Sequence, residues 1–425
     1  MRRGIAKSLF LKIENNSFLR NRKALSLLEN RWAAFPVQIC VRAVRNNSSC
    51  PNDGGWTMTN EANPASLQAW SVANTLSEKV LAQDKNGVWS PACVASLLTI
   101  VRKGASGATR RELDMLLGGG DMFGERDPFG IERERNWGYD GYDASSATAA
   151  WLSKSANPSE AFLHECDRCG VHVSIDDLAD PCVGQRVTDW IAEQTHGLLS
   201  PGIELSPVAL ACLVSALYMK DAWADPFDGE STKVENFHAK DGDIQTAFMH
   251  GKRDCAVIVE NGSVAFSLPL SSDAGMCFVL PSGEDGHVDD ALGLFERLSQ
   301  GEGEWGPVDL GIPRFECEST LSDVCSLLKA AGISAATAME LAPMVGVEGT
   351  PTQIVHGAKF AVDENGVEAG AYTAMVAVAG LPPENPPEPR KITLDRPFYA
   401  ALMSRAGVPL FVANAALPSV DVQER

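Results

Sequence analysis

The order in which two residue patterns follow each other along the chain restricts its fold more than any other feature. In the first half, apolar residues recur at helical spacing, as in residues 66–84, where Leu67, Trp70 and Ala73 share one face. After Leu210 the chain changes to short apolar or alternating runs separated by Gly, Pro and Asp, which is typical of strands and turns. Because helices precede strands without regular β-α-β alternation, we expect an α+β fold with a mainly antiparallel sheet.

Capping residues predict where two helices begin. Ser90 suits an N-cap and Pro91 the first helical position, because the N–H that proline lacks would have no partner inside the helix there. Thr109 and Glu112 have the spacing of a capping box. The stretch "GQRVTDWIAEQTHGLL" predicts another helix, which ends near Gly197.

Composition and charge argue against two classes of protein. The chain has 425 residues, of which 45% are hydrophobic and 21% charged, as is ordinary for a globular protein. Its net charge of −19 argues against a nucleic-acid partner. It contains no run of about 18 uncharged apolar residues, so we expect no membrane span. Eleven cysteines, several of them inside apolar runs, indicate buried free thiols rather than a disulfide framework.

The N-terminal residues differ in charge from the rest of the chain. Residues 1–58 hold ten Lys and Arg against three Asp and Glu and therefore carry +7, which leaves −26 for the remainder. Charged residues and Asn interrupt their apolar runs, whereas a secretory signal has a continuous apolar core of about 7–15 residues. We interpret residues 1–60 as a basic extension, either a disordered tail or the product of a start site placed too early, before a single domain over residues 61–425.

Motifs for catalysis or metal binding are weak. The stretch "GEGEWG" has the glycine spacing of a dinucleotide loop, but Glu302 and Glu304 would repel phosphate and no strand precedes it. Four zinc-ligand types lie within nine residues: His164, Cys166, Cys169 and His172. Structural zinc sites usually draw on two separated pairs, so a half-buried helix is the favoured interpretation of this cluster. We expect no enzyme, no cofactor and no metal.

One segment near the C-terminus joins a strand-like half to a half that cannot pair. If residues 364–380 form a strand, alternate side chains lie on opposite faces. One face is small and nearly all apolar: Asn365, Val367, Ala369, Ala371, Thr373, Met375, Ala377 and Ala379. The other begins with the acidic Glu364 and bears Tyr372, and so suits solvent. The prolines of "LPPENPPEP" then stop any ladder, because proline lacks the N–H that a central strand donates.

Three interpretations of this segment remain open from the pattern alone. An Ala-rich helix is disfavoured by Gly366 and Gly370, each of which costs about 1 kcal/mol relative to Ala. An edge strand followed by a polyproline linker also fits. The third interpretation is a strand that has not yet been inserted into its sheet.

Several segments, taken together and in order, resemble the serpin family. They are "NGVWSPACVASLLTIVRKGASGATRREL", "VTDWIAEQTHGLL", "LVSALYMKDAWADPF", "IPRFECESTLSDVCSLLKAAGI" and "LDRPFYAALMSRAGVPLFVANAALP". The resemblance extends over residues 62–420. It implies an α+β serpin fold with about nine helices around a large, mainly antiparallel central sheet, two smaller sheets and an exposed reactive-centre loop.

The resemblance also implies a function. A serpin inhibits serine proteases, or in some members cysteine proteases, by forming a covalent acyl-enzyme that is trapped when the cut loop inserts into the central sheet. The expected partner is thus a serine protease, with no nucleic acid and no membrane, and the expected state is a monomer. A non-inhibitory serpin-fold binding or chaperone protein is the alternative. The family is mostly extracellular, while the unpaired cysteines and the poor signal match point to the cytoplasm as the other compartment.

The resemblance assigns roles to individual residues. Ser90 and His356 match the shutter beneath the sheet, and Trp223 matches the breach at its end. Ser215 stands where the family usually has a shutter Asn, and Cys93 where it has a second Ser. The hinge of the loop would consist of Glu364, Gly366, Val367, Ala369, Ala371 and Thr373.

The reactive bond follows from counting along the loop. Seventeen residues from Glu364 end at Gly380 and, at about 3.3 Å per residue, would cross a large sheet. The expected scissile bond is Ala379–Gly380 or Gly380–Leu381. Because the residues before it are small and uncharged, the resemblance points to elastase- or subtilisin-like targets.

Overall fold

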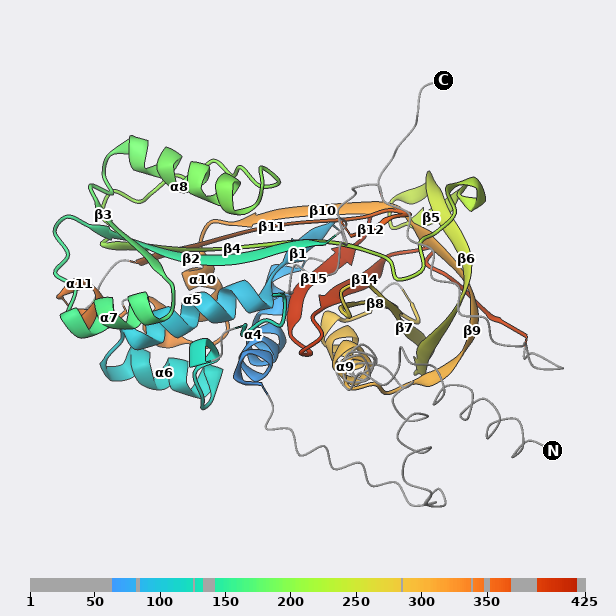
Figure 1. Cartoon of the computed structure of the whole chain (residues 1–425), viewed down its shortest axis with the longest axis horizontal. Coiled ribbons are helices and arrows are strands. Elements are labelled where there is room, and N and C mark those ends of the chain that lie inside the picture. Colours follow the sequence, from blue (N-terminus) through green and yellow to red (C-terminus); the bar gives the residue numbers. More distant parts are fainter. Residues whose placement is uncertain are drawn as a thin grey trace, which may run out of the picture. The chain divides into compact units, whose positions relative to one another are not determined.

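Strands arranged in two sheets form the framework of the molecule (Figure 1). The computed structural model describes residues 63–81, 85–124, 127–132, 142–283, 286–337, 339–347, 352–367 and 388–418. These residues all belong to one unit, Asn60–Arg425. The basic extension predicted for residues 1–60 lies outside the described residues and stays a prediction.

The six-stranded sheet has the order β10-β11-β12-β4-β2-β3 and carries the candidate site. Its strands are β2 (Asp143–Ser153), β3 (His172–Asp176), β4 (Ala211–Ala222), β10 (Phe315–Leu321), β11 (Thr352–Val362) and β12 (Gly366–Val367). The pairs β2–β3 and β11–β4 are parallel and the others are antiparallel. A mainly antiparallel α+β fold is therefore confirmed.

The nine-stranded sheet has the order β1-β15-β14-β8-β7-β6-β9-β13, with β5 paired to β6. Its strands are β1 (Gly87–Trp89), β5 (Lys233–Ala239), β6 (Gly242–Glu260), β7 (Ser263–Pro269), β8 (Gly275–Leu280), β9 (Glu304–Pro313), β13 (Arg390–Thr393), β14 (Phe398–Met403) and β15 (Pro409–Ala415). The two smaller sheets expected from the resemblance are continuous here, because the 19-residue β6 pairs with β5 and β9 along one part and with β7 along the other.

Helices cover both faces of the six-stranded sheet (Figure 1). The α-helices among the described residues are α4 (Pro64–Val80), α5 (Pro91–Lys103), α6 (Gly107–Leu117), α7 (Glu160–Arg168), α8 (Pro181–Gln194), α9 (Val288–Ser299), α10 (Val324–Ala330) and α11 (Ala342–Val345), with 3-10 turns η2 (Met122–Gly124), η4 (Gly229–Ser231) and η5 (Ser334–Thr337). Of these, α9 packs instead on β7, β8 and β14 of the nine-stranded sheet. Helix α8 lies on one face, which we call the outer face, and α5 and α6 lie on the opposite, inner face.

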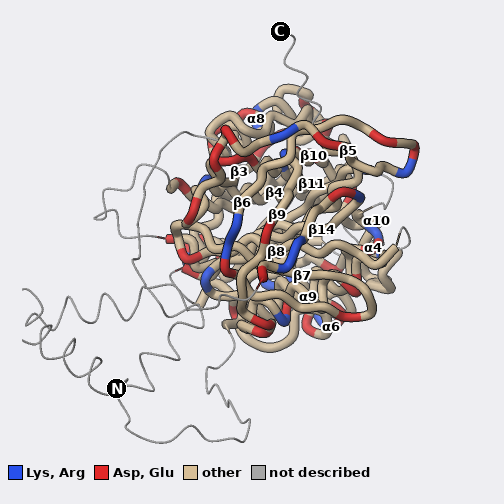
Figure 2. The backbone as a smooth tube through the Cα atoms, turned by 90° about the vertical axis from the view of Figure 1, so that its right-hand side faces the viewer, with Lys and Arg blue, Asp and Glu red and all other residues tan. Residues whose placement is uncertain are grey.

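Alternation along β4 divides the core into two clusters. Leu213 and Leu217 point to the inner face, into the main cluster with α4 and α5. Cys212 and Val214 point to the outer face, where Val355 of β11 joins them against α8. In the side view of Figure 2, Asp and Glu positions are spread around the described residues rather than collected in one patch.

The predicted start of α5 is confirmed, and that of α6 is wrong. The Ser90 hydroxyl accepts the N–H of Cys93 at 3.1 Å, and Pro91 begins the helix. Helix α6 begins earlier than the capping-box spacing predicts, after Ser106. Its first N–H groups, including that of Thr109, donate to the carboxylate of Glu340, which lies far away in sequence. A tertiary contact thus caps α6 in place of the local Thr–Glu pair.

Candidate functional site

The central feature of the six-stranded sheet is a gap between two parallel strands. β11 pairs with β4 only at one end, where Thr352–Val355 lie beside Ala211–Val214. Beyond these residues no described strand lies between Ser215–Lys220 of β4 and His356–Ala361 of β11. We call this interval the strand gap. Each strand pairs normally on its other side, with β2 and β10 respectively.

A short strand closes the far end of the gap. In β12, Gly366 lies opposite Ala222 and Val367 opposite Asp221, both in β4. Val367 also lies opposite Val362 of β11. The predicted hinge therefore enters the sheet between β4 and β11, and the chain is directed into the strand gap from this end.

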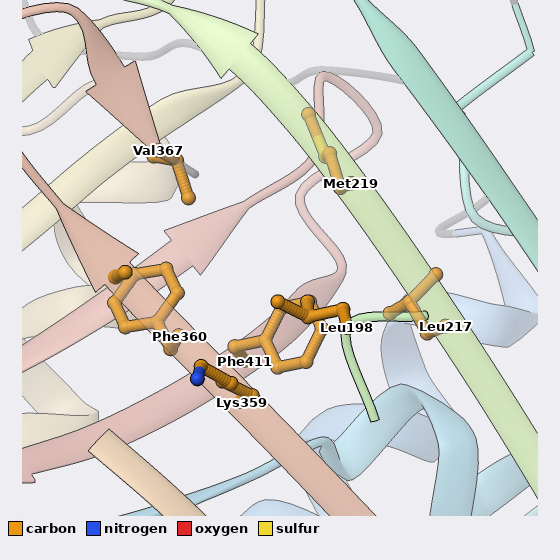
Figure 3. A pocket seen from close by; sticks show the side chains of 8 residues that line it. Leu198, Leu217, Met219, Lys359, Phe360, Val367 and Phe411 are labelled. Carbon is orange, nitrogen blue, oxygen red and sulfur yellow. The ribbon is translucent and has the colours of Figure 1, made fainter. Parts of the chain in front are cut away.

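An apolar cavity lies in the gap below Val367 (Figure 3). About 300 Å³ of space here, part of it open to solvent, is not filled by atoms. Its lining comes from both edges of the gap, from β15 and from the chain after α8: Leu198, Leu217, Met219, Lys359, Phe360, Ala361, Val367 and Phe411. The cavity marks a place where the sheet lacks side chains that would pack on the inner core.

An ion pair holds the first hinge residue. The Arg314 guanidinium donates three hydrogen bonds to the Glu364 carboxylate, at 3.0 and 2.9 Å from Nε to Oε1 and Oε2 and at 2.7 Å from Nη2 to Oε1. The Thr232 hydroxyl donates to the same carboxylate at 2.5 Å. Glu364 is only 8% exposed. The prediction that Glu364 lies on a solvent-facing side is therefore wrong, because partners distant in sequence draw its side chain into the protein.

Charge balance keeps Glu364 ionised in this buried position. Burial alone would raise the pKa of its carboxyl group, but the hydrogen bonds from Arg314 and Thr232 outweigh burial and hold the pKa below its ordinary value. The sequence carries one signal for this pair. Arg314 is a single cation between two strand runs, whereas Glu364 is one of three acids, with Asp363 and Glu368, at the start of the small-residue segment.

Trp223, the predicted breach residue, contacts the backbone on both sides of Glu364. The Trp223 indole donates to the carbonyl of Asp363 at 2.8 Å, and the Trp223 N–H donates to the carbonyl of Asn365 at 2.9 Å. Trp223 is buried.

Only glycine fits at residue 366. Gly366 has φ of +156°, and a Cβ there would lie 2.1 Å from the carbonyl oxygen of Asp221. The hinge thus passes β4 at a distance that excludes a side chain.

Buried polar groups lie under the opposite end of the gap. Nε2 of His356 accepts the N–H of Ser90 at 2.9 Å, so the ring proton is on Nδ1, for which no described residue provides a partner. Burial lowers the pKa of His356 to about 4. The Ser96 hydroxyl lies 3.3 Å from that of Ser215 and 3.4 Å from that of Thr148. The predicted shutter residues therefore lie together, and Ser96 and Thr148 join them.

Two features of this polar cluster bear on the sequence analysis. Ser96 and Thr148 were missed, although a Ser within the apolar helix "ACVASLL" is a usable signal. The Cys93 thiol lies beside the cluster, and burial raises its pKa, so it stays a thiol.

Six residues of the predicted loop lie outside the described residues: Ala369, Ala371, Thr373, Ala379, Gly380 and Leu381. The nine described cysteines are all free. The described ranges contain no group of three or more His, Cys, Asp or Glu side chains placed to hold a metal. None of the described helices is both long and apolar enough to cross a membrane.

Comparisons with known proteins agree with this geometry. The model of the serpin (serine protease inhibitor) family matches residues 68–418. A serine protease inhibitor from Cyanea capillata is 28% identical over 366 residues, which cover 79% of this chain and 93% of that protein. Serpin-Z2B from Triticum aestivum is 26% identical over 383 residues, which cover 82% of this chain and 94% of the relative.

Solved structures show the same fold. The thermophilic serpin tengpin in its native state superposes with a TM-score of 0.73 at 18% identity, over 86% of this chain and 96% of tengpin. Serpin48 from Tenebrio molitor superposes with a TM-score of 0.69 at 22% identity, over 85% of this chain and all of that one. The fold and the family match define a protein of the serine protease inhibitor class. The chain belongs to the serpin family.

Proposed function

We propose that this serpin is a suicide-substrate inhibitor of serine proteases, in which the cleaved loop fills the strand gap. The observation that carries the proposal is the pair of facing strand edges with the hinge already between them at one end. A strand that continues from Val367 would form ladder hydrogen bonds with both edges. Each bond contributes roughly 0.5–1.5 kcal/mol net, so about a dozen would drive the insertion.

The register of β12 defines where each later residue would lie. Continuing its antiparallel pairing places residue 369 between Met219 and Phe360, and residue 371 between Leu217 and Ala358. The loop has Ala at both positions, and small side chains suit a site that large side chains already line.

The same register gives the polar cluster a partner. Residue 373 would lie between Ser215 and His356, above the hydroxyls of Ser96 and Thr148. The loop has Thr at this position. Its hydroxyl would accept from Nδ1–H of His356, which supports the insertion of a polar residue at this one inward-facing position.

The proposed mechanism follows from this insertion. The protease attacks the exposed loop and forms an acyl-enzyme on its catalytic serine. The loop then inserts and draws the attached protease along the sheet. Distortion of the protease separates its serine from the oxyanion hole, so that hydrolysis of the acyl bond stops. The product is a covalent one-to-one complex, in which the C-terminal fragment is severed from the chain but keeps β13, β14 and β15 in the nine-stranded sheet.

The small residues before the reactive bond set the proposed target class. Cleavage at Ala379–Gly380 or Gly380–Leu381 suits elastase- or subtilisin-like proteases, whose primary pockets accept small side chains. Gly370 and Tyr372 depart from the small Ala-like residues of the family, but both would face outward in the inserted register. We further propose a monomer and, by family resemblance, an extracellular protein.

Incubation with elastase and, separately, with trypsin tests the proposal. A denaturing gel is expected to show a covalent band with elastase and only cleavage with trypsin. A covalent band with trypsin alone would contradict the target class. Cleavage by elastase without any covalent band, together with an unchanged melting temperature of the cut protein, would instead favour the non-inhibitory binding or chaperone alternative.

A further inference from the structure

The connection between α8 and β4 crosses the outer face of the gapped sheet. We call residues 195–210 the strap. One side chain of α8 fixes the strap to that helix: the Thr188 hydroxyl donates to the carbonyl of Pro201 at 2.7 Å and accepts the N–H of Ile203 at 3.2 Å. Helix α8 packs in the outer cluster, whose sheet residues come from β2 and β4 except for Val355 of β11. The strap therefore belongs to the half of the sheet that contains β4.

Gln353 fastens the strap to the other half. Its Oε1 accepts the N–H of Ser206 at 3.0 Å, and its Nε2 donates to the carbonyl of Glu204 at 3.0 Å. Gln353 is in β11, directly opposite Cys212 of β4 in the parallel pair. Both polar atoms of one amide thus join β11 to a segment that is fixed on the β4 side.

Opening of the sheet would break this connection. A strand inserted between β4 and β11 separates them by about 4.8 Å more than a direct pair. Two hydrogen bonds of 3.0 Å do not survive such a displacement unless the strap leaves α8. The closed state contains these bonds and the inserted state does not, so they oppose insertion.

We propose that Gln353 is a latch that holds the sheet closed and so sets the rate of loop insertion. The proposal rests on the proposed function, because it assigns a regulating residue to the same strand gap. Gln353 is a positioning residue, since it acts through the strap and touches no reacting atom.

Two Gln353 variants and one control test the latch. Gln353→Ala removes both bonds, whereas Gln353→Glu keeps the acceptor for Ser206 and loses the donor. Gln185→Ala is the control, because Gln185 of α8 donates to Asp189 of the same helix at 2.7 Å and does not cross the gap. The measurements are the rate of covalent complex formation with elastase and the melting temperatures of uncut and cut protein.

The latch predicts effects on the uncut protein alone. Gln353→Ala is expected to form the complex about fivefold faster or more, with Gln353→Glu between it and the wild type and Gln185→Ala unchanged. The melting temperature of the uncut Gln353→Ala protein is expected to fall, while that of the cut protein stays at the wild-type value.

Two results would overturn the latch, and they differ in meaning. If Gln353→Ala lowers the melting temperature of cut and uncut protein equally, or leaves the rate of covalent complex formation unchanged, the latch is contradicted and the proposed function stays in place. A cut wild-type protein that gains no stability removes the proposed function, and the latch with it.

Discussion

Arg314 and Glu364 meet through three hydrogen bonds just before the predicted hinge enters the sheet as β12, with Nη2 of Arg314 2.7 Å from Oε1 of Glu364. Arg314 lies between β9 and β10, and Glu364 lies in the turn between β11 and β12. The pair therefore holds the entry of the loop against the neighbouring edge of the sheet. Any motion of the hinge has to keep or break this contact.

Loss of the Arg314 cation is expected to destabilise the uncut protein. Arg314→Ala leaves the buried Glu364 carboxylate without a cation, although the Thr232 hydroxyl and a backbone N–H still donate to it, and the expected loss is about 1–3 kcal/mol in the free energy of unfolding. Denaturant unfolding measures it. Arg297→Ala is the matched control, because Arg297 pairs with Glu260 and Glu302 at the surface and is expected to cost about 1 kcal/mol or less. Equal losses for both variants would contradict the hinge role of Arg314.

Addition of a side chain at residue 366 is expected to expel the hinge. In Gly366→Ala the new Cβ would meet the carbonyl oxygen of Asp221 at 2.1 Å, so β12 has to leave its place beside β4. We expect the free energy of unfolding to fall by about 1–3 kcal/mol and amide hydrogen exchange at Asp221 and Ala222 to become faster. Gly229→Ala is the control, since a Cβ there meets nothing within 4 Å. Exchange rates that match the wild type would contradict this account of Gly366.

Acid is expected to destabilise the fold through His356. Burial lowers its pKa in the folded protein to about 4, against an ordinary value of 6.5. Between these pH values the unfolded chain binds a proton that the folded chain does not, so stability falls as pH falls from 6.5 towards 4. Over this range the free energy of unfolding falls by about 2–4 kcal/mol. The test is the free energy of unfolding of the wild type and of His356→Gln, measured across this pH range. The variant is expected to lose the dependence on pH that His356 causes. The same pH dependence in both proteins would refute the role of His356.

Introduction of a charge at residue 371 is expected to convert the inhibitor into a substrate. The register places this residue between Leu217 and Ala358, facing the apolar core, where an unpaired carboxylate is costly. Elastase is expected to cut the Ala371→Glu variant but to form at least tenfold less covalent complex with it than with the wild type. The melting temperature of the uncut variant is expected to equal that of the wild type. Gly370→Glu is the control, because residue 370 would face outward beside Lys359. Equal complex yields for the two variants would show that the register is wrong.

Local chemistry made parts of the fold predictable. Ser90 and Pro91 define the start of α5 by themselves, because a cap needs only its own helix. The two runs around "RAG" become β14 and β15 because each is short, almost entirely apolar and buried along its whole length, and their turn is short. The serpin family was also predictable, since many segments keep their order along the chain.

Other features depend on contacts between residues far apart in sequence. The cap of α6 comes from Glu340, and the burial of Glu364 depends on Arg314 and Thr232. Strand β2 was not predicted, because "DASSATAAWLS" has weak alternation and is defined by its long pairing with β4. The strand gap itself has no local signal, since it arises from the register of two strands that lie 141 residues apart.

The most direct measurement of the central claim is the melting temperature of the protein before and after elastase cuts the loop. If the cut loop fills the strand gap, about a dozen new ladder hydrogen bonds raise the melting temperature by about 10 °C or more. The same digest then contains covalently trapped elastase. A cut protein that melts at the temperature of the uncut one, beside fully active elastase, would contradict the account.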